Sequence, residues 1–126
     1  MARRALAGNG FERQRALAAS LPGATEDIKW GADLVYSVGA KMFCVFLLDN
    51  AAPVTCSLKV DDDRFIELTG LPGVSPAPYL ARAHWVQVGR DHALGSAALD
   101  ELVRRSYALV AGKLTKKLQK ELGVGT

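Results

Sequence analysis

Four short apolar runs, separated by turn residues, follow one another between residues 25 and 60. The runs are Ile28–Trp30, Leu34–Val38, Lys41–Leu48 and Val54–Val60. The interruptions between them contain glycine, aspartate or proline and are too short to hold a helix. The pattern therefore predicts an up-and-down meander of antiparallel strands.

The spacing of apolar residues inside two of these runs indicates which faces of the sheet are covered. Lys41–Leu48 is apolar at both odd and even positions, which is typical of a central strand with some cover on both faces. Val54–Val60 alternates, so that Thr55, Ser57 and Lys59 point away from the core. We therefore expect one buried sheet face and one face that is at least partly open.

The rest of the chain predicts helices around a fifth strand. Residues 11–20 favour a helix capped by Asn9 or Gly10, and a short helix opens at Asp61–Asp63. A Pro-rich and Gly-rich loop follows, and His84–Val88 is the fifth strand. Ser96 is the expected N-cap of a long helix.

That long helix should break near Gly112, because a continuous helix would place Lys113 in its apolar stripe. Leu114, Leu118 and Leu122 then mark a second short helix. The resulting fold class is α+β, with an antiparallel five-stranded sheet and helices packed on one face. Its predicted element order is α-β-β-β-β-α-β-α.

Length and composition indicate a single soluble domain over residues 1–126. The longest apolar run, Met42–Leu48, is much shorter than the roughly 20 residues of a membrane helix. Arg3 and Arg4 resemble the start of a signal peptide, but polar residues interrupt the apolar stretch that should follow. With only two cysteines in the chain, we expect a cytoplasmic protein.

Charge is distributed unevenly along the chain. The net charge of +3 combines +3 over residues 1–15, −5 over residues 16–101 and +5 over residues 102–126. Attraction to nucleic acid would therefore come mainly from the two ends of the chain.

The sequence shows no arrangement typical of an enzyme or of a cofactor site. His84 and His92 lack metal-ligand spacing, and no phosphate-binding loop or nucleophile elbow is present. Asp61–Asp63 could hold a cation, but acidic residues at the start of a helix more often interact with its N-terminus. We expect no catalytic residues, no metal and no cofactor.

Cys44 and Cys56 lie at inward positions of neighbouring predicted strands. A disulfide between them is geometrically conceivable. Two buried thiols that act as small apolar side chains are the preferred interpretation in a reducing compartment.

Several short segments, in a fixed order, resemble the MmcQ/YjbR family. They are Leu21–Glu26, Trp30-Gly31, Val35–Phe43, Leu58-Lys59, Pro78–Leu80, His84–Val86 and Ser106–Val110. The similarity covers about residues 10–114 and leaves 115–126 as a basic C-terminal extension. It implies a two-layer α+β fold, often called a double wing, and a DNA-binding role. Val86 departs from the pattern, because many members carry asparagine after the His-Trp pair.

Two surfaces are candidates for binding. The first is the open sheet face, where Lys41, Lys59 and Trp85 would combine cations with an aromatic ring. The alternative interpretation of this face is that Trp30 and Trp85 belong to the core. The second surface is the basic C-terminal end, which could bind phosphates. The alternative interpretation there is an ordinary solvated helix face. Its cations are Arg104, Arg105, Lys113, Lys116, Lys117 and Lys120.

Two functions of different classes follow. The preferred hypothesis is a small non-enzymatic protein that binds DNA or another nucleic acid, and most of that preference comes from the family resemblance. The alternative is a protein-interaction module, as a homodimer or with another partner, that uses the open sheet face or the loop Leu71–Leu80. No membrane partner is expected.

Overall fold

A six-stranded antiparallel sheet forms one layer of the protein. The computed structural model describes residues 11–29, 33–49 and 52–124. Within these residues the spatial order of the strands is β1-β2-β3-β4-β6-β5. The strands are β1 (Ala24–Lys29), β2 (Asp33–Val38), β3 (Lys41–Asp49), β4 (Ala52–Lys59), β5 (Val74–Pro76) and β6 (Trp85–Gly89).

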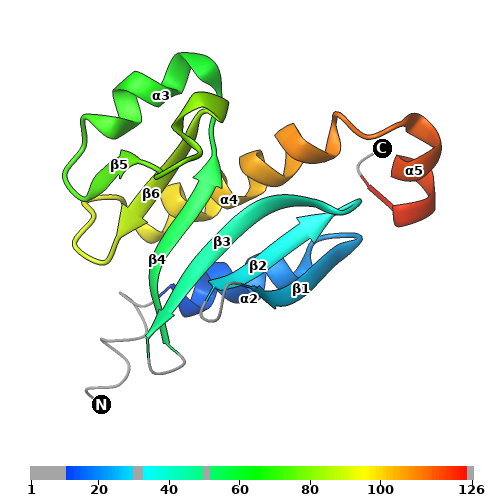
Figure 1. Ribbon diagram of the computed structural model, residues 1–126, viewed down its shortest axis with the longest axis horizontal. Coiled ribbons are helices and arrows are strands. Elements are labelled where there is room, and N and C mark those ends of the chain that lie inside the picture. The colour runs from blue at the N-terminus through cyan, green and yellow to red at the C-terminus, as the bar shows by residue number, and fades with distance from the viewer. Residues whose placement is uncertain (1–10, 30–32, 50–51, 125–126) are drawn as a thin grey trace.

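The helices form the second layer, on one face of this sheet (Figure 1). They are α2 (Glu12–Ser20), α3 (Asp62–Thr69), α4 (Ser96–Ala111) and α5 (Lys116–Leu122), with a 3-10 turn η1 (Ala81–Ala83) before β6. The long helix α4 packs on β3 and β4, α2 packs on α4 and β1, and α3 packs on β5 and β6. The predicted α+β class is confirmed.

The register of the strands assigns residues to the two faces. Val35, Val45, Ser57, Gln87 and Ser75 are successive partners across β2, β3, β4, β6 and β5. Because directly paired residues point to the same side of a sheet, these five form one row across the open face. The predicted outward positions of β4 are therefore correct.

The core lies between the sheet and the helices. It contains Tyr36, Phe43, Phe46, Leu58 and Val86 from the strands, all at most 1% exposed. Helix α4 contributes its buried stripe, which includes Leu99, Leu102, Val103 and Val110. The apolar periodicity of this helix was therefore a good guide to its buried face.

Two strands differ from the prediction. The sheet has six strands rather than five, because Val74–Pro76 pairs with β6 inside the stretch that was expected to be only a loop. This strand is short, lies at the sheet edge and contains Pro76, so it lacks the usual sequence pattern. The first strand starts at Ala24 rather than Ile28, because the polar segment Thr25–Asp27 still pairs with β2.

Two helix and strand ends also differ. The N-cap of α4 is Gly95, and Ser96 is the first helical residue. His84 precedes β6 in a left-handed backbone conformation instead of belonging to the strand. The predicted caps Asn9 and Gly10, as well as Trp30, lie outside the described residues.

The predicted break after the long helix is confirmed. Helix α4 ends at Ala111 with Gly112 as its C-cap, and α5 starts after Thr115, whose hydroxyl accepts a hydrogen bond from the Leu118 amide at 3.1 Å. Among the described helices, none is long and apolar enough to cross a membrane.

Candidate nucleic-acid interface

Strands β3 and β4 separate at one end of the sheet, and this separation creates the site. Their pairing ends at Cys44 and Leu58. Beyond that point β3 continues beside β2, whereas β4 continues beside β6. Figure 1 shows the two strands diverging, with α4 passing across the gap.

Ser106 of α4 holds the two separated strands in place. Its hydroxyl accepts a hydrogen bond from the Lys59 amide at 2.9 Å and donates one to the Phe43 carbonyl at 2.6 Å. The two backbone groups have lost their partners in the sheet, and the serine replaces those partners in a fully buried position.

A hollow of about 540 Å³ lies at this gap and is lined by three lysines. Lys41 begins β3, Lys59 ends β4, and Lys113 follows α4, so three distant segments each contribute a lysine to the lining of one hollow. Met42, Trp85 and Val110 supply the apolar part of the lining. Lys41 and Lys113 are exposed, whereas the Lys59 ammonium donates a hydrogen bond to the Ala83 carbonyl at 2.5 Å.

Close packing explains why Lys41 and Lys113 are neighbours. Gly39, in the turn before Lys41, has φ +58°, and a Cβ atom there would lie 2.7 Å from Cδ1 of Leu114. The side chain of Leu114 therefore occupies the space that glycine leaves open. This contact places the residue after Lys113 against the turn that precedes Lys41.

The lysines of α5 follow directly. Lys116, Lys117 and Lys120 are all exposed, and Leu118 and Leu122 pack against the core. We call the six lysines at this end of the molecule the basic surface. They are Lys41, Lys59, Lys113, Lys116, Lys117 and Lys120.

Trp85 lines the hollow but offers little of its ring. Its side chain is buried, with 5% of the residue exposed. Stacking on a base needs an accessible ring face. As the partner of Lys59, Trp85 lies on the open side of the sheet, outside the core cluster between the sheet and the helices, and it is covered there.

The two arginines of α4 do not line the hollow with the three lysines. Two residues along a helix correspond to about 200° of rotation, so Arg104 projects from the side of α4 opposite Ser106. Arg105 forms a bidentate pair with the Asp61 carboxylate, with N–O distances of 2.8 and 2.9 Å. This pair lowers the pKa of Asp61 and raises that of Arg105.

Asp61 and Asp62, at the start of α3, both contact side chains from other parts of the protein. Asp61 occupies the N-cap position, but its side chain pairs with Arg105 and makes no hydrogen bond to the helix. Asp62 lies 2.7 Å from Nδ1 of His84, whose ring packs edge-on against Phe65. These contacts link α3 to α4 and to the start of β6.

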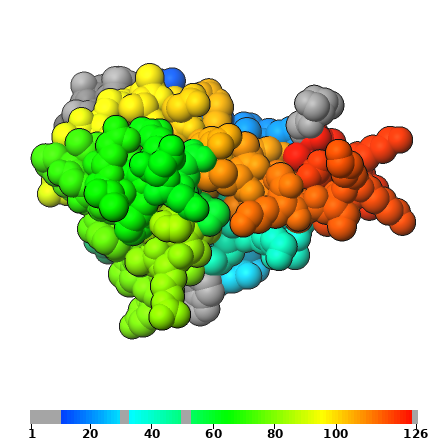
Figure 2. Space-filling model, turned by 90° about the horizontal axis from the view of Figure 1, so that it is seen from above, coloured from blue at the N-terminus to red at the C-terminus, as the bar shows by residue number. Residues whose placement is uncertain are grey.

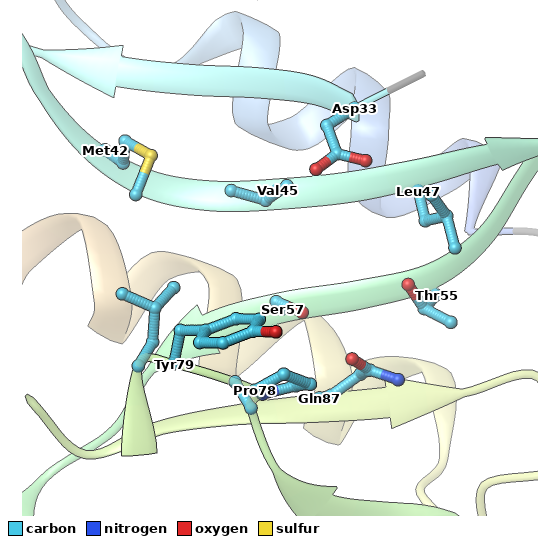
Figure 3. Close-up of a pocket in the computed structure, with 11 residues that line it drawn as sticks. Asp33, Met42, Val45, Leu47, Thr55, Ser57, Pro78, Tyr79 and Gln87 are labelled. Carbon is cyan, nitrogen blue, oxygen red and sulfur yellow. The ribbon is translucent and has the colours of Figure 1, made fainter. Parts of the chain in front are cut away.

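The open sheet face carries a second hollow, of about 580 Å³ (Figure 3). Its lining comes from the outward residues of β2, β3, β4 and β6 and from the loop after β5. Asp33, Tyr79 and Gln87 were not identified from the sequence as residues of a site. Their strands and loop were recognised, but the position of the loop over the sheet has no sequence signal.

Cys44 and Cys56 are fully buried free thiols whose sulfur atoms lie 3.8 Å apart. Burial, together with the hydrogen bond to Cys56, raises the pKa of the Cys44 thiol well above its usual range. The thiols therefore pack as small apolar side chains in this structure.

Comparisons with known proteins identify the family. The YjbR family model matches residues 19–109. The crystal structure of Deinococcus radiodurans protein DR2400, with a domain described as DUF419, superposes with a TM-score of 0.77 at 32% identity and covers 89% of this chain and 86% of that one.

A Pseudomonas syringae protein shares the fold, with a TM-score of 0.58 at 18% identity over 87% of this chain and 99% of that one. A search of curated proteins finds no match. The family match spans the whole sheet and almost all of α4. The chain therefore belongs to the YjbR family.

Proposed function

We propose that this protein binds nucleic acid without transforming it, and that the basic surface contacts the phosphate backbone. The observation that supports this most is the hollow in which Lys41, Lys59 and Lys113 meet although they lie far apart in the chain. A cluster of lysine ammonium groups is attracted to a chain of phosphates without reading base sequence.

Helix α5 extends the same cluster. Its three lysines lie within seven residues, next to Lys113, and Glu121 is the acidic residue on that helix. A strand of nucleic acid could thus meet cations in the hollow and on the helix at once. Since Trp85 is buried, binding should depend on charge far more than on base stacking.

A binding experiment with a matched charge control tests the proposal. Fluorescence anisotropy would follow a labelled duplex of about twenty base pairs and its single strand at low salt. The double substitution Lys41→Gln with Lys113→Gln should weaken binding about tenfold, because each phosphate contact contributes to affinity.

The control variant combines Lys29→Gln with Arg90→Gln. Both residues are exposed and lie at the other end of the sheet, since Lys29 pairs with Asp33 and Arg90 follows the end of β6. It has the same net charge as the test variant, and we expect its affinity to stay within about twofold of the native value. If neither the duplex nor the single strand binds at low salt, the proposal is refuted.

A further inference from the structure

Side chains of β3, β4 and β6 form the floor of the hollow on the open sheet face. Val45 and Ser57 are direct partners in the central row, and Leu47 pairs with Thr55 in the next row. The floor therefore has an apolar side on β3 and a hydroxyl-bearing side on β4. Gln87 of β6 adds an amide next to Ser57.

The loop between β5 and η1 forms a wall over this floor. Backbone hydrogen bonds fix it to β6 on both sides, from the Ala77 amide to the Trp85 carbonyl at 3.0 Å and from the Trp85 amide to the Leu80 carbonyl at 3.2 Å. In the space-filling view this part of the chain, coloured yellow-green, projects from the body of the molecule (Figure 2).

Tyr79 lies at the tip of the loop and is fully exposed. Its backbone has φ 66°, a left-handed conformation that a bulky residue rarely adopts. In Figure 3 the ring of Tyr79 lies over the hollow, and its hydroxyl group is directed toward Ser57 in this view. An aromatic ring on a loop whose backbone is fixed, beside an apolar floor, can cover a bound molecule.

The charge of this hollow is opposite to that of the basic surface. Among the residues that the structure describes, Asp33 is the one charged residue in its lining. Lys29 lies opposite Asp33 in the register, yet among the described residues no cation is within 4.0 Å of the Asp33 carboxylate. The carboxylate is thus available to a positively charged group from outside.

We propose that this hollow binds a small molecule that combines a flat apolar body with a protonated amine. The volume falls within the range of roughly 300–1,000 Å³ that is typical of small-molecule sites. The apolar body would lie between Val45 and Tyr79, and the amine would pair with Asp33. The proposal is independent of nucleic-acid binding, because no lysine of the basic surface lines this hollow, and the hollow between β3 and β4 shares only Met42 with it.

The test uses three indole probes that differ in charge: tryptamine, indole and indole-3-acetate. Amide chemical shifts of the native protein would be followed by NMR during each titration. Tryptamine should bind about fivefold more tightly than indole-3-acetate, the difference expected for one partly exposed ion pair. The affinity of indole should lie between those of the other two probes. The chemical-shift changes should map to β3, β4 and β6.

Variants separate the roles of charge and shape. Asp33→Asn should remove most of the preference for tryptamine, whereas Asp27→Asn should keep it. Asp27 is a matched control because its partner Val35 places it on the same face, outside the lining of the hollow. Tyr79→Ala should weaken all three probes severalfold without affecting folding, because the side chain is fully exposed.

Three outcomes would overturn the proposal. The first is the absence of saturable shifts with any probe up to about ten millimolar, since a fitted pocket should hold a molecule of this size more tightly. The second is equal affinity for the amine and the carboxylate. The third is that the same amides shift with protein concentration alone, which would mean that a second copy of the chain covers this face.

Discussion

At the scale of single residues, Ser106 has the clearest structural role. It is a buried polar side chain in a helix, and its hydroxyl satisfies two backbone groups where β3 and β4 separate. A small hydroxyl-bearing side chain meets both requirements, as the donor to Phe43 and the acceptor from Lys59. The hollow with the three lysines depends on this arrangement.

We expect Ser106→Ala to lower the free energy of unfolding by about 1–3 kcal/mol, because it leaves a buried amide and a buried carbonyl without partners. Chemical denaturation would measure the loss. Ser96→Ala is the control, since Ser96 is exposed in the first turn of the same helix and makes no capping hydrogen bond. Equal stability of the two variants would contradict this role for Ser106.

The two cysteines make a second prediction at this scale. Because burial raises the pKa of Cys44, its reactive thiolate should be scarce at pH 8. Mass spectrometry after iodoacetamide treatment should show almost no labelling of the native protein and two labels after unfolding. Rapid labelling of the native protein would show that the thiols are not buried. An unreduced mass lower by two hydrogens would show that they are not free.

At the scale of elements, the link between α3 and α4 depends on an ion pair. Asp61 precedes α3 and receives two hydrogen bonds from Arg105 of α4. The pair lowers the pKa of Asp61 in the folded protein. It therefore stabilises the fold above the ordinary pKa of an aspartate and loses this effect as the pH falls through the lowered value.

We predict that Asp61→Asn lowers the Tm at pH 7 by about 1–3 °C, a small effect because the pair is partly exposed to solvent. Below both pKa values the variant and the native protein should melt together. Asp63→Asn, in the first turn of the same helix, controls for the helix dipole. If Asp61→Asn still lowers the Tm in strong acid, Asp61 does not stabilise the protein through its ion pair with Arg105.

Elements with a clear apolar period were predictable, and short polar ones were not. The alternation of Val54–Val60 and the stripe of α4 gave correct faces because burial imposes these periods on the sequence. Strand β5 and the first half of β1 were missed because backbone pairing places no such requirement on Ser75, Pro76 or Thr25.

The site was predictable only in part for the same reason. Lys41, Lys59 and Lys113 could be named as candidates from their charge and position. Their meeting in one hollow depends on the divergence of β3 and β4 and on the contact of Gly39 with Leu114. Those are contacts between distant residues, and a single sequence carries no direct signal for them.

At the scale of the whole molecule, two hollows of different charge lie on one small domain. The basic surface gathers lysines at the end of the sheet where β3 and β4 separate, and the hollow on the open face has Asp33 as the charged residue of its described lining. A phosphate chain should be attracted to the first site and repelled by the carboxylate at the second.

The salt dependence of DNA binding tests the central claim most directly. The logarithm of the association constant for a labelled duplex should fall linearly with the logarithm of salt concentration. Loss of Lys41 and Lys113 should make the slope shallower by about 1.8, because each phosphate contact contributes about 0.9. An unchanged slope in that variant, or an equal change in the variant without Lys29 and Arg90, would contradict the account.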